Sequence, residues 1–342
     1  MKREKMTRKK KMVIENKAYA RAGLLGNPSD GYFGRIIAIV VKNFSARVFL
    51  RESEELRIEA SEQDFDTWKG RRDFLEKINF YGYYGGTRLL KAALRIFLDY
   101  CGAQAIALEE RNFEMSYSST IPRQVGLGGS SAFIVAALRC LMEFFRVEIP
   151  SEILPTLALN AELKELGINA GFMDRVVQVY EGCVFMDLDR GLIEKRGYGQ
   201  YERLDPKLLP PLYLAYKTEL GKVSGHVLSE IRLAYDRGDP FVVETLRRIA
   251  GLAAEGKRTY YQEDLKRWPA MMNENFDLRS RIMKISESNM EMIRTARRCG
   301  ASAKFAGSGG SIIGIYQDEE MYARLVGELG QIGASVIKPI IE

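Results

Sequence analysis

The chain has 342 residues, of which 46% are hydrophobic and 28% charged, with a formal net charge of +6 at pH 7. This length favours two domains, and the composition is typical of a globular protein rather than a membrane, collagen-like or disordered chain. Four scattered cysteines and a single histidine argue against a disulfide framework, a zinc site and a Ser–His–Asp triad. With no signal-peptide pattern and no membrane-length apolar run, we expect a cytoplasmic protein.

The positive charge is concentrated at the N-terminus. The first 11 residues hold seven Lys and Arg and one Glu, so the remainder is close to neutral. We expect residues 1–11 to form a disordered, solvated tail and expect no nucleic-acid or membrane partner. The alternative is a basic arm that binds nucleic acid.

The first half of the chain contains segments with the hydrophobic period of a helix and segments with the alternation of a strand. A period near 3.6 predicts helices over residues 83–101, from the end of a glycine-rich loop to about 147, 151–166 (capped by Ser151, stopped by Gly167) and 170–179. Alternation or short apolar runs predict strands over 36–41, 45–50, 56–60, 104–108 and 184–188, the first three as one antiparallel set. Residues 61–79 indicate a loop with a helical piece, and the polar segment 115–120 does not indicate a buried strand.

The second half begins after a stretch rich in glycine and proline, 189–211, which we interpret as a domain boundary. We place the domains at 12–205 and 206–342. Further helices are predicted over 223–235, 241–255, 264–298 and 319–329, and strands over 212–216, 302–306, 311–316 and 335–337. Strands, then helices, then strands indicate α+β layers in each half, without fixing the topology.

The segment 121–133, IPRQVGLGGSSAF, has the pattern of an anion-binding loop. Gly126, Gly128 and Gly129 leave the backbone N–H groups accessible, and the helix that follows adds the positive end of its dipole. A nucleotide phosphate is the expected anion, and an ordinary tight turn is the alternative. No Lys follows the last glycine, so this is not the usual P-loop, and the polar segment before it does not suit a dinucleotide fingerprint.

Four segments together resemble the GHMP small-molecule kinases, which include galactokinases, homoserine kinases and mevalonate kinases. In chain order they are AYARAGLLGNPSD (18–30), the loop from Pro122 to Ala132, GFMD (171–174) and AKFAGSGGS (303–311). The resemblance implies a two-domain α+β fold, with an N-terminal nucleotide-binding α/β domain and a C-terminal ferredoxin-like domain. It also implies an ATP- and Mg²⁺-dependent kinase.

Within this family the chain most resembles the plant-type glucuronokinases, over about residues 18–316. The matching runs include RAGLLGNPSDGYFGR (21–35), YYGGTRLL (83–90) and NFDLR (275–279). This implies phosphorylation of the anomeric hydroxyl of glucuronate, a sugar acid. Galacturonate or a neutral hexose is an alternative acceptor, and a sugar sensor without turnover is another possibility. Asn27 and Pro28 stand where galactokinases carry Glu-His, which argues against a simple galactokinase.

The resemblance also implies roles for individual residues. Asp174 would be the base that takes the proton of the attacking hydroxyl, and Arg21 would keep it ionised. Mg²⁺ would be held by Ser131 or Ser130 with Glu162. Alternatively, Asp174 is an acidic residue favoured at a helix N-terminus, Ser130 or Ser131 caps the helix, and Glu162 is solvated on a helix face. The phosphate-binding residues would be Pro122, Gly126, Leu127, Gly128, Gly129, Ser130, Ser131 and Ala132.

The sugar would be bound by residues of several motifs. These are Asp30, Arg21, Asp174, Gly309, Gly310, Lys304 and Arg279. For Asp30 the alternative is a structural role in a turn, because Asn-Pro-Ser-Asp is a good turn sequence. The carboxylate of a sugar acid calls for an arginine, and Arg35, Arg175 and Arg279 are the candidates. Trp68, Tyr83 and Tyr84 are candidates for stacking on adenine, with core packing as the alternative. The oligomeric state is left open.

Overall fold

A computed structural model describes residues 13–60, 85–218 and 225–342. The predictions for the basic tail, for the segment 61–79 and for Trp68, Tyr83 and Tyr84 lie outside these residues.

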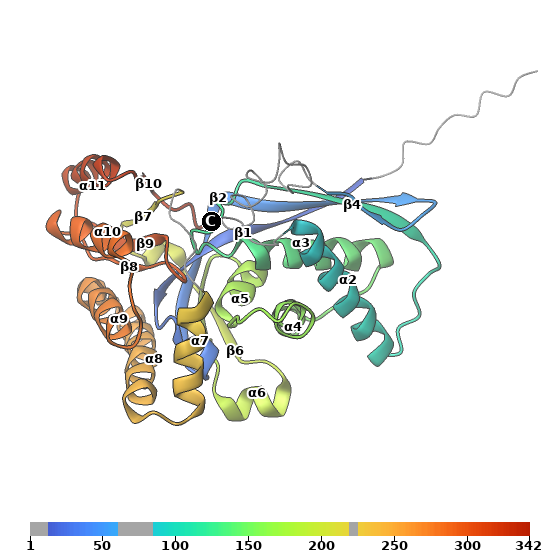
Figure 1. The fold of residues 1–342 in the computed structure, drawn as a ribbon, viewed down its shortest axis with the longest axis horizontal. Helices are drawn as coiled ribbons and strands as arrows, with labels where there is room; N and C mark the ends of the chain where they lie inside the picture. The colour runs from blue at the N-terminus through green and yellow to red at the C-terminus, as the bar shows by residue number, and fades with distance from the viewer. Residues whose placement is uncertain (1–12, 61–84, 219–224) are drawn as a thin grey trace, which may run out of the picture.

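The first half of the chain is built around one long strand, β2 (Arg35–Ser53). β1 (Val13–Leu25) runs antiparallel along nearly its whole length, and on its other edge β2 pairs with β4 near one end and β5 near the other. The sheet has six strands in the order β3-β4-β2-β5-β6, with β1 beside β2 (Figure 1). The remaining bounds are β3 (Arg57–Ile58), β4 (Asn112–Ser119), β5 (Cys183–Asp187) and β6 (Gln200–Leu204).

Several predictions for this sheet are wrong. Residues 36–41 and 45–50 are one strand rather than two antiparallel partners, because β2 continues through its polar middle with a register shift opposite Tyr19 and Ala20. The residues 104–108 form no strand, since the chain leaves the preceding helix in a turn with Ala105 at a φ of 52°. The polar segment 115–120 belongs largely to β4, which buries Phe113, Met115 and Tyr117 in alternation.

Helices cover this sheet and carry part of the site. α3 packs on β1 and β2 and buries apolar residues along nearly its whole length. The predicted helix 151–166 begins later, at Leu154, and Ser151 does not cap it. The bounds are α2 (Gly86–Ala103), α3 (Gly129–Phe145), α4 (Leu154–Asn160), a π-helical turn (Ala161–Glu165), α5 (Met173–Tyr180) and α6 (Arg190–Arg196).

The second half contains a four-stranded antiparallel sheet in the order β10-β7-β9-β8. The chain passes from one strand through helices to a strand pair, then through one helix to the last strand. This is the split βαβ arrangement of a ferredoxin-like domain, as predicted. The strands are β7 (Leu212–Tyr216), β8 (Lys304–Phe305), β9 (Ser311–Ile315) and β10 (Ser335–Ile337). The helices are α7 (Gly225–Asp236), α8 (Pro240–Tyr261), α9 (Trp268–Ile282), α10 (Glu287–Arg298) and α11 (Glu319–Gln331).

The two halves are in close contact. α8 packs on β1 and β2 of the first sheet, and the Gly23 N–H of β1 donates to the Ala306 carbonyl at 2.8 Å. The C-terminus returns to β2, where the Lys42 N–H donates to the Ile340 carbonyl at 2.7 Å (Figure 1). The division into 12–205 and 206–342 stays a prediction, with α6 and β6 inside the predicted boundary stretch. Within the described ranges, none of the helices combines the length and apolarity that a membrane span requires.

Candidate active site

A cavity of about 510 Å³ lies where the two glycine-rich segments meet. One wall is the loop before α3, another is the turn between β8 and β9, and the start of α5 faces both. The residues used below that line it are Arg21, Asp30, Tyr32, Gly126, Gly128, Ser130, Glu162, Asp174, Arg175, Arg232, Arg279, Gly307 and Ser308.

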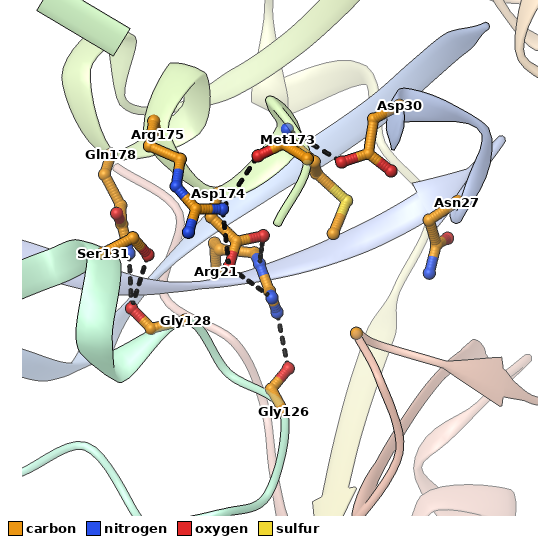
Figure 2. A network of polar contacts seen from close by, with 12 residues as sticks. Arg21, Asn27, Asp30, Gly126, Gly128, Ser131, Met173, Asp174, Arg175 and Gln178 are labelled. Atoms are coloured by element: carbon orange, nitrogen blue, oxygen red, sulfur yellow. Dashed lines mark hydrogen bonds and ion pairs between the residues drawn. The ribbon is translucent and has the colours of Figure 1, made fainter. Parts of the chain in front are cut away.

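The centre of the cavity is an ion pair between Arg21 and Asp174. Arg21 comes from β1 and donates to both carboxylate oxygens of Asp174, from Nε at 2.6 Å and from Nη2 at 2.7 Å. Its Nη1 donates to the Gly126 carbonyl at 2.5 Å (Figure 2). The two side chains are 6% and 15% exposed. Such a bidentate, sheltered pair fixes both the carboxylate and the adjacent glycine loop.

The loop itself needs glycine. Gly126 and Gly128 have φ values of 69° and 76°, and a Cβ on Gly128 would stand 3.0–3.3 Å from side-chain atoms of Gln178, Arg21 and Asp174. Gly128 is the N-cap of α3, so the first N–H groups of that helix open toward the cavity. The loop is thus a wall of backbone donors directly beside the Arg21–Asp174 pair.

The two serines of the motif point in different directions. Ser130 lines the cavity and donates to Glu162 Oε1 at 2.7 Å. Ser131 is fully buried and donates to the Gly128 carbonyl at 3.0 Å, beside the Gln178 amide (Figure 2). Pro122, Leu127 and Gly129 also line the cavity, whereas Ser131 and Ala132 lie behind its wall.

Glu162 is paired with a cation. It lies in the π-helical turn, is 1% exposed, and forms an ion pair with Arg175. Arg175 also donates to the Gly171 carbonyl at 2.8 Å and lies 3.6 Å from Asp174 Oδ2. Ser130 and Glu162 therefore present a hydroxyl and a carboxylate together, which are ligands that suit Mg²⁺. Among the described residues, no cluster of three or more His, Cys, Asp or Glu side chains could hold a metal.

The second glycine segment touches the first through its backbone. A Cβ on Gly307 would overlap the Gly126 carbonyl oxygen and stand 2.6 Å from Arg21 Nη1. Gly309 and Gly310, predicted to contact the substrate, lie behind Gly307 and Ser308 and do not line the cavity. The Gly310 N–H donates to Asn289 Oδ1 at 2.9 Å instead.

Lys304 also lies outside the cavity lining. Its ammonium donates to the carbonyls of Gly23 at 2.7 Å and Phe305 at 2.8 Å, and to the Asn27 side chain. Burial lowers the pKa of Lys304 well below its usual value. With all three N–H groups bonded, Lys304 ties β1 to β8.

Asp30 stands at the opposite end of the cavity from the glycine loop. Its Oδ2 accepts the Met173 N–H at 3.1 Å, at the start of α5 (Figure 2). Burial, followed by the charge of Asp174, raises the pKa of Asp30 to about 6. A Cβ on Gly171 would overlap the Asp30 carboxylate, so the glycine of the GFMD segment makes room for it.

Known proteins resemble this chain in sequence and in fold. Residues 88–182 match the family model for the N-terminal domain of GHMP kinases, and residues 252–331 match the model for their C-terminal domain. Glucuronokinase 1 of Arabidopsis thaliana is 40% identical over 96% of this chain and 92% of its own length. Probable glucuronokinase 2 of the same plant is 41% identical over 96% and 91%.

The chain belongs to the GHMP kinase family. It is therefore a phosphotransferase with an alcohol group as acceptor, and the resemblance noted in the sequence is confirmed. Lactococcus lactis galactokinase complexed with galactose shares the fold, with a TM-score of 0.75 and 15% identity over 96% of this chain and 93% of that one.

Sequence patterns missed two side chains that line the cavity of this GHMP kinase. Arg232 comes from α7, donates to the Gly31 carbonyl at 2.6 Å, and lies over the Tyr32 ring at 4.5 Å. Arg232 belongs to an ordinary helix pattern, and no nearby motif marks it. Tyr32 lies inside the run 21–35, but an aromatic residue after a turn carries no signal of its own.

Proposed function

We propose that this GHMP kinase transfers the γ-phosphoryl group of ATP to the anomeric hydroxyl of D-glucuronate, giving glucuronate 1-phosphate and ADP. The observation that carries the proposal is the sheltered Arg21–Asp174 pair, set directly beside a glycine loop that opens a helix. The two Arabidopsis relatives named as glucuronokinases, at 40% and 41% identity over nearly the full chain, support the choice of acceptor.

Asp174 is the general base in this reaction. It accepts the proton of the anomeric hydroxyl as that oxygen attacks the γ-phosphorus, and the bond to the β-phosphate oxygen breaks to release ADP. Arg21 is the positioning residue, because its two N–H donors hold both carboxylate oxygens of Asp174. General-base help of this kind is worth about 10²- to 10⁴-fold in rate.

The glycine loop binds the phosphates. The N–H groups at the start of α3 point at one place, and the positive end of the helix dipole adds to them. Gly307 lets the second glycine segment approach the loop closely, so the phosphoryl group moves along a wall made mostly of backbone.

Ser130 and Glu162 are the proposed ligands of Mg²⁺. Their oxygens lie 2.7 Å apart on the cavity wall, and both are of the hard type that the ion prefers. Magnesium, when bound, neutralises charge on the phosphates. Ser131 takes no part, since its hydroxyl is bonded to the Gly128 carbonyl behind the wall. Asp30 accepts hydrogen bonds from sugar hydroxyls at the far end of the cavity.

ADP release in the presence of Mg²⁺ and ATP tests the proposal. The acceptors are glucuronate, galacturonate, glucose, galactose and mevalonate, and ³¹P NMR identifies the phosphorylated position. We expect the highest kcat/KM with glucuronate and a 1-phosphate product. A preference for another acceptor contradicts the proposed substrate. Sugar binding without turnover contradicts the proposed reaction and favours a sensor.

A further inference from the structure

Five arginines line the cavity, and one that is buried, Arg279, forms no ion pair with a carboxylate of the described residues. Arg21 and Arg175 form ion pairs with Asp174 and Glu162. Arg232 lies 3.8 Å from Asp236, and Arg123 is exposed on the glycine-loop segment. Arg279 of α9 is 2% exposed, and no Asp or Glu of the described ranges forms an ion pair with it.

The contacts of Arg279 are all with neutral groups. Nη1 donates to the Gly307 carbonyl at 2.7 Å, Nη2 to the Ser308 carbonyl at 3.5 Å, and Nε to Met283 Sδ at 3.3 Å. These bonds use three of the five N–H groups that a guanidinium carries. Burial lowers its pKa to about 10, so Arg279 remains charged at pH 7. The charge of Asp30 partly offsets this effect of burial, but no carboxylate of the described ranges contacts Arg279, so an anion that reaches its remaining N–H groups is favoured.

Arg279 is linked to the Arg21–Asp174 pair through one residue, Gly307. It binds the carbonyl of Gly307, the residue that packs against Arg21 and Gly126. In the pyranose ring of a hexuronate, only the ring oxygen separates the anomeric carbon from the carbon that bears the carboxylate. When the anomeric hydroxyl of a sugar acid faces Asp174, its carboxylate therefore lies no farther from Asp174 than about the width of one sugar ring.

The other candidates fit less well. Arg35 is 43% exposed, pairs with Asp187 at 2.7 Å and does not line the cavity. Arg175 is already paired with Glu162. Lys304 is a second buried cation with no ion pair in the described ranges, but it does not line the cavity, and its three N–H groups are all bonded within the protein.

We propose that Arg279 binds the carboxylate of the sugar acid and thereby selects uronates over neutral hexoses. The proposal rests on the proposed function and adds the residue that recognises the charge. The planar guanidinium offers two parallel N–H donors to a carboxylate, which gives direction as well as attraction.

The test compares glucuronate with glucuronamide, its neutral amide of nearly the same shape. We expect Arg279→Gln to reduce the preference for glucuronate over glucuronamide, measured as a ratio of kcat/KM, by roughly 10- to 150-fold. Arg279→Lys keeps the charge but not the two parallel donors, so its ratio lies between those of the wild type and the Gln variant. Arg35→Gln is the matched control, and its ratio equals that of the wild type.

The possible results distinguish failure of this inference from failure of the proposed function. If Arg279→Gln lowers both kcat/KM values equally, Arg279 only supports the Gly307–Ser308 turn and the inference is wrong, while the proposed function stands. If the wild type itself prefers glucuronamide or phosphorylates neither compound, the proposed function fails. Thermal unfolding checks that each variant is folded. If Arg279→Gln does not fold, Arg279→Lys decides the question. A ratio of kcat/KM for glucuronate over glucuronamide equal to that of the wild type then contradicts the inference.

Discussion

Asp174 and Asp30 face the same cavity, but their surroundings differ. Asp174 receives two N–H bonds from one guanidinium, whereas Asp30 receives a single backbone N–H bond. Environments that differ in this way let two carboxyl groups serve different purposes. Asp174 suits the proposed role of base, while burial raises the pKa of Asp30 to about 6.

Replacing the base should affect turnover and leave the nucleotide site intact. We expect Asp174→Asn to lower kcat by a hundredfold or more, because the amide cannot take the proton. Binding of ATP, measured by titration calorimetry, should change little. Asp187→Asn removes a partly exposed ion pair with Arg35 outside the cavity and is the control. Near-normal turnover in Asp174→Asn would remove this residue from the base role.

The raised pKa of Asp30 predicts a stability that depends on pH. The folded protein keeps a proton on Asp30 up to about pH 6, whereas the unfolded chain loses it near 3.8. The wild type therefore loses free energy of unfolding as pH rises from about 4 through 6. Asp30→Asn escapes this loss, so it should be more stable than the wild type at pH 8 by up to about 3 kcal/mol.

Urea unfolding at pH 5 and pH 8 measures this difference. The gain from Asp30→Asn should be larger at pH 8 than at pH 5, and KM for the sugar should rise in the same variant because a charged acceptor is lost. An equal gain at both pH values would show that burial of the Asp30 charge is not the cause.

Sequence alone could identify some residues of the site but not their orientation. The Arg21–Asp174 pair joins positions 153 residues apart, and only the motif match brought them together. The motif also includes Lys304, but this residue does not line the cavity, and its ammonium is bonded to Gly23 and Asn27 instead. A pattern of residue types cannot tell which side of a two-residue strand such as β8 a side chain takes.

At the scale of elements, the start of α3 separates two adjacent hydroxyls. Successive helix positions differ by roughly 100° around the axis, so Ser130 and Ser131 point in different directions. The sequence left their roles open, and the structure turns only Ser130 toward Glu162.

These two serines give a matched pair of variants. Ser130→Ala should raise the Mg²⁺ concentration needed for half-maximal activity severalfold, because one oxygen ligand is lost. Ser131→Ala should instead cost about 1 kcal/mol of stability through the lost bond to Gly128, with its Mg²⁺ dependence unchanged. A Mg²⁺ titration of activity and a thermal unfolding curve distinguish them. The reverse pattern would assign the ligand role to Ser131.

The strands were harder to predict than the helices for physical reasons. β1 buries mostly small side chains, among them Ala18, Ala20 and Ala22, which give a weak hydrophobic signal. The middle of β2 is polar and only partly buried, so the sequence pattern predicts two short strands in place of one long strand. Long amphipathic helices such as α8 and α11 repeat their signal over several turns, and their positions agree with the predictions to within a few residues at most ends.

At the scale of the whole molecule, α8 joins the two halves. It follows β7 in the chain, yet it packs on β1 and β2 of the first sheet. Gly256 is the point of close approach, since a Cβ there would overlap Leu25 Cδ1 and lie 3.2 Å from Ile37 Cδ1. A Cβ on Gly251 of the same helix would meet no atom within 4 Å, so this glycine is a matched control for Gly256.

The two glycines should respond oppositely to alanine. Gly251→Ala should stabilise the protein by about 0.5–1 kcal/mol, because alanine favours the helix. Gly256→Ala should destabilise it by about 1–2 kcal/mol, since overpacking against Leu25 and Ile37 exceeds the same helix gain. Urea unfolding measures both. Stabilisation by both substitutions would mean that α8 does not rest on the first sheet at Gly256.

The contact between Gly126 and Gly307 makes the cavity wall at the proposed site of phosphoryl transfer out of backbone. At the opposite end the side chains of Asp30, Tyr32 and Arg232 line the cavity, and in the described part of the chain none of them is hydrogen-bonded to either glycine segment. These three side chains can therefore be replaced without loss of a hydrogen bond to the wall, whereas Arg279 is bonded to Gly307 and Ser308 of the wall itself. Substitutions of Asp30, Tyr32 or Arg232 can then reshape this end of the cavity one side chain at a time, with the backbone wall unchanged.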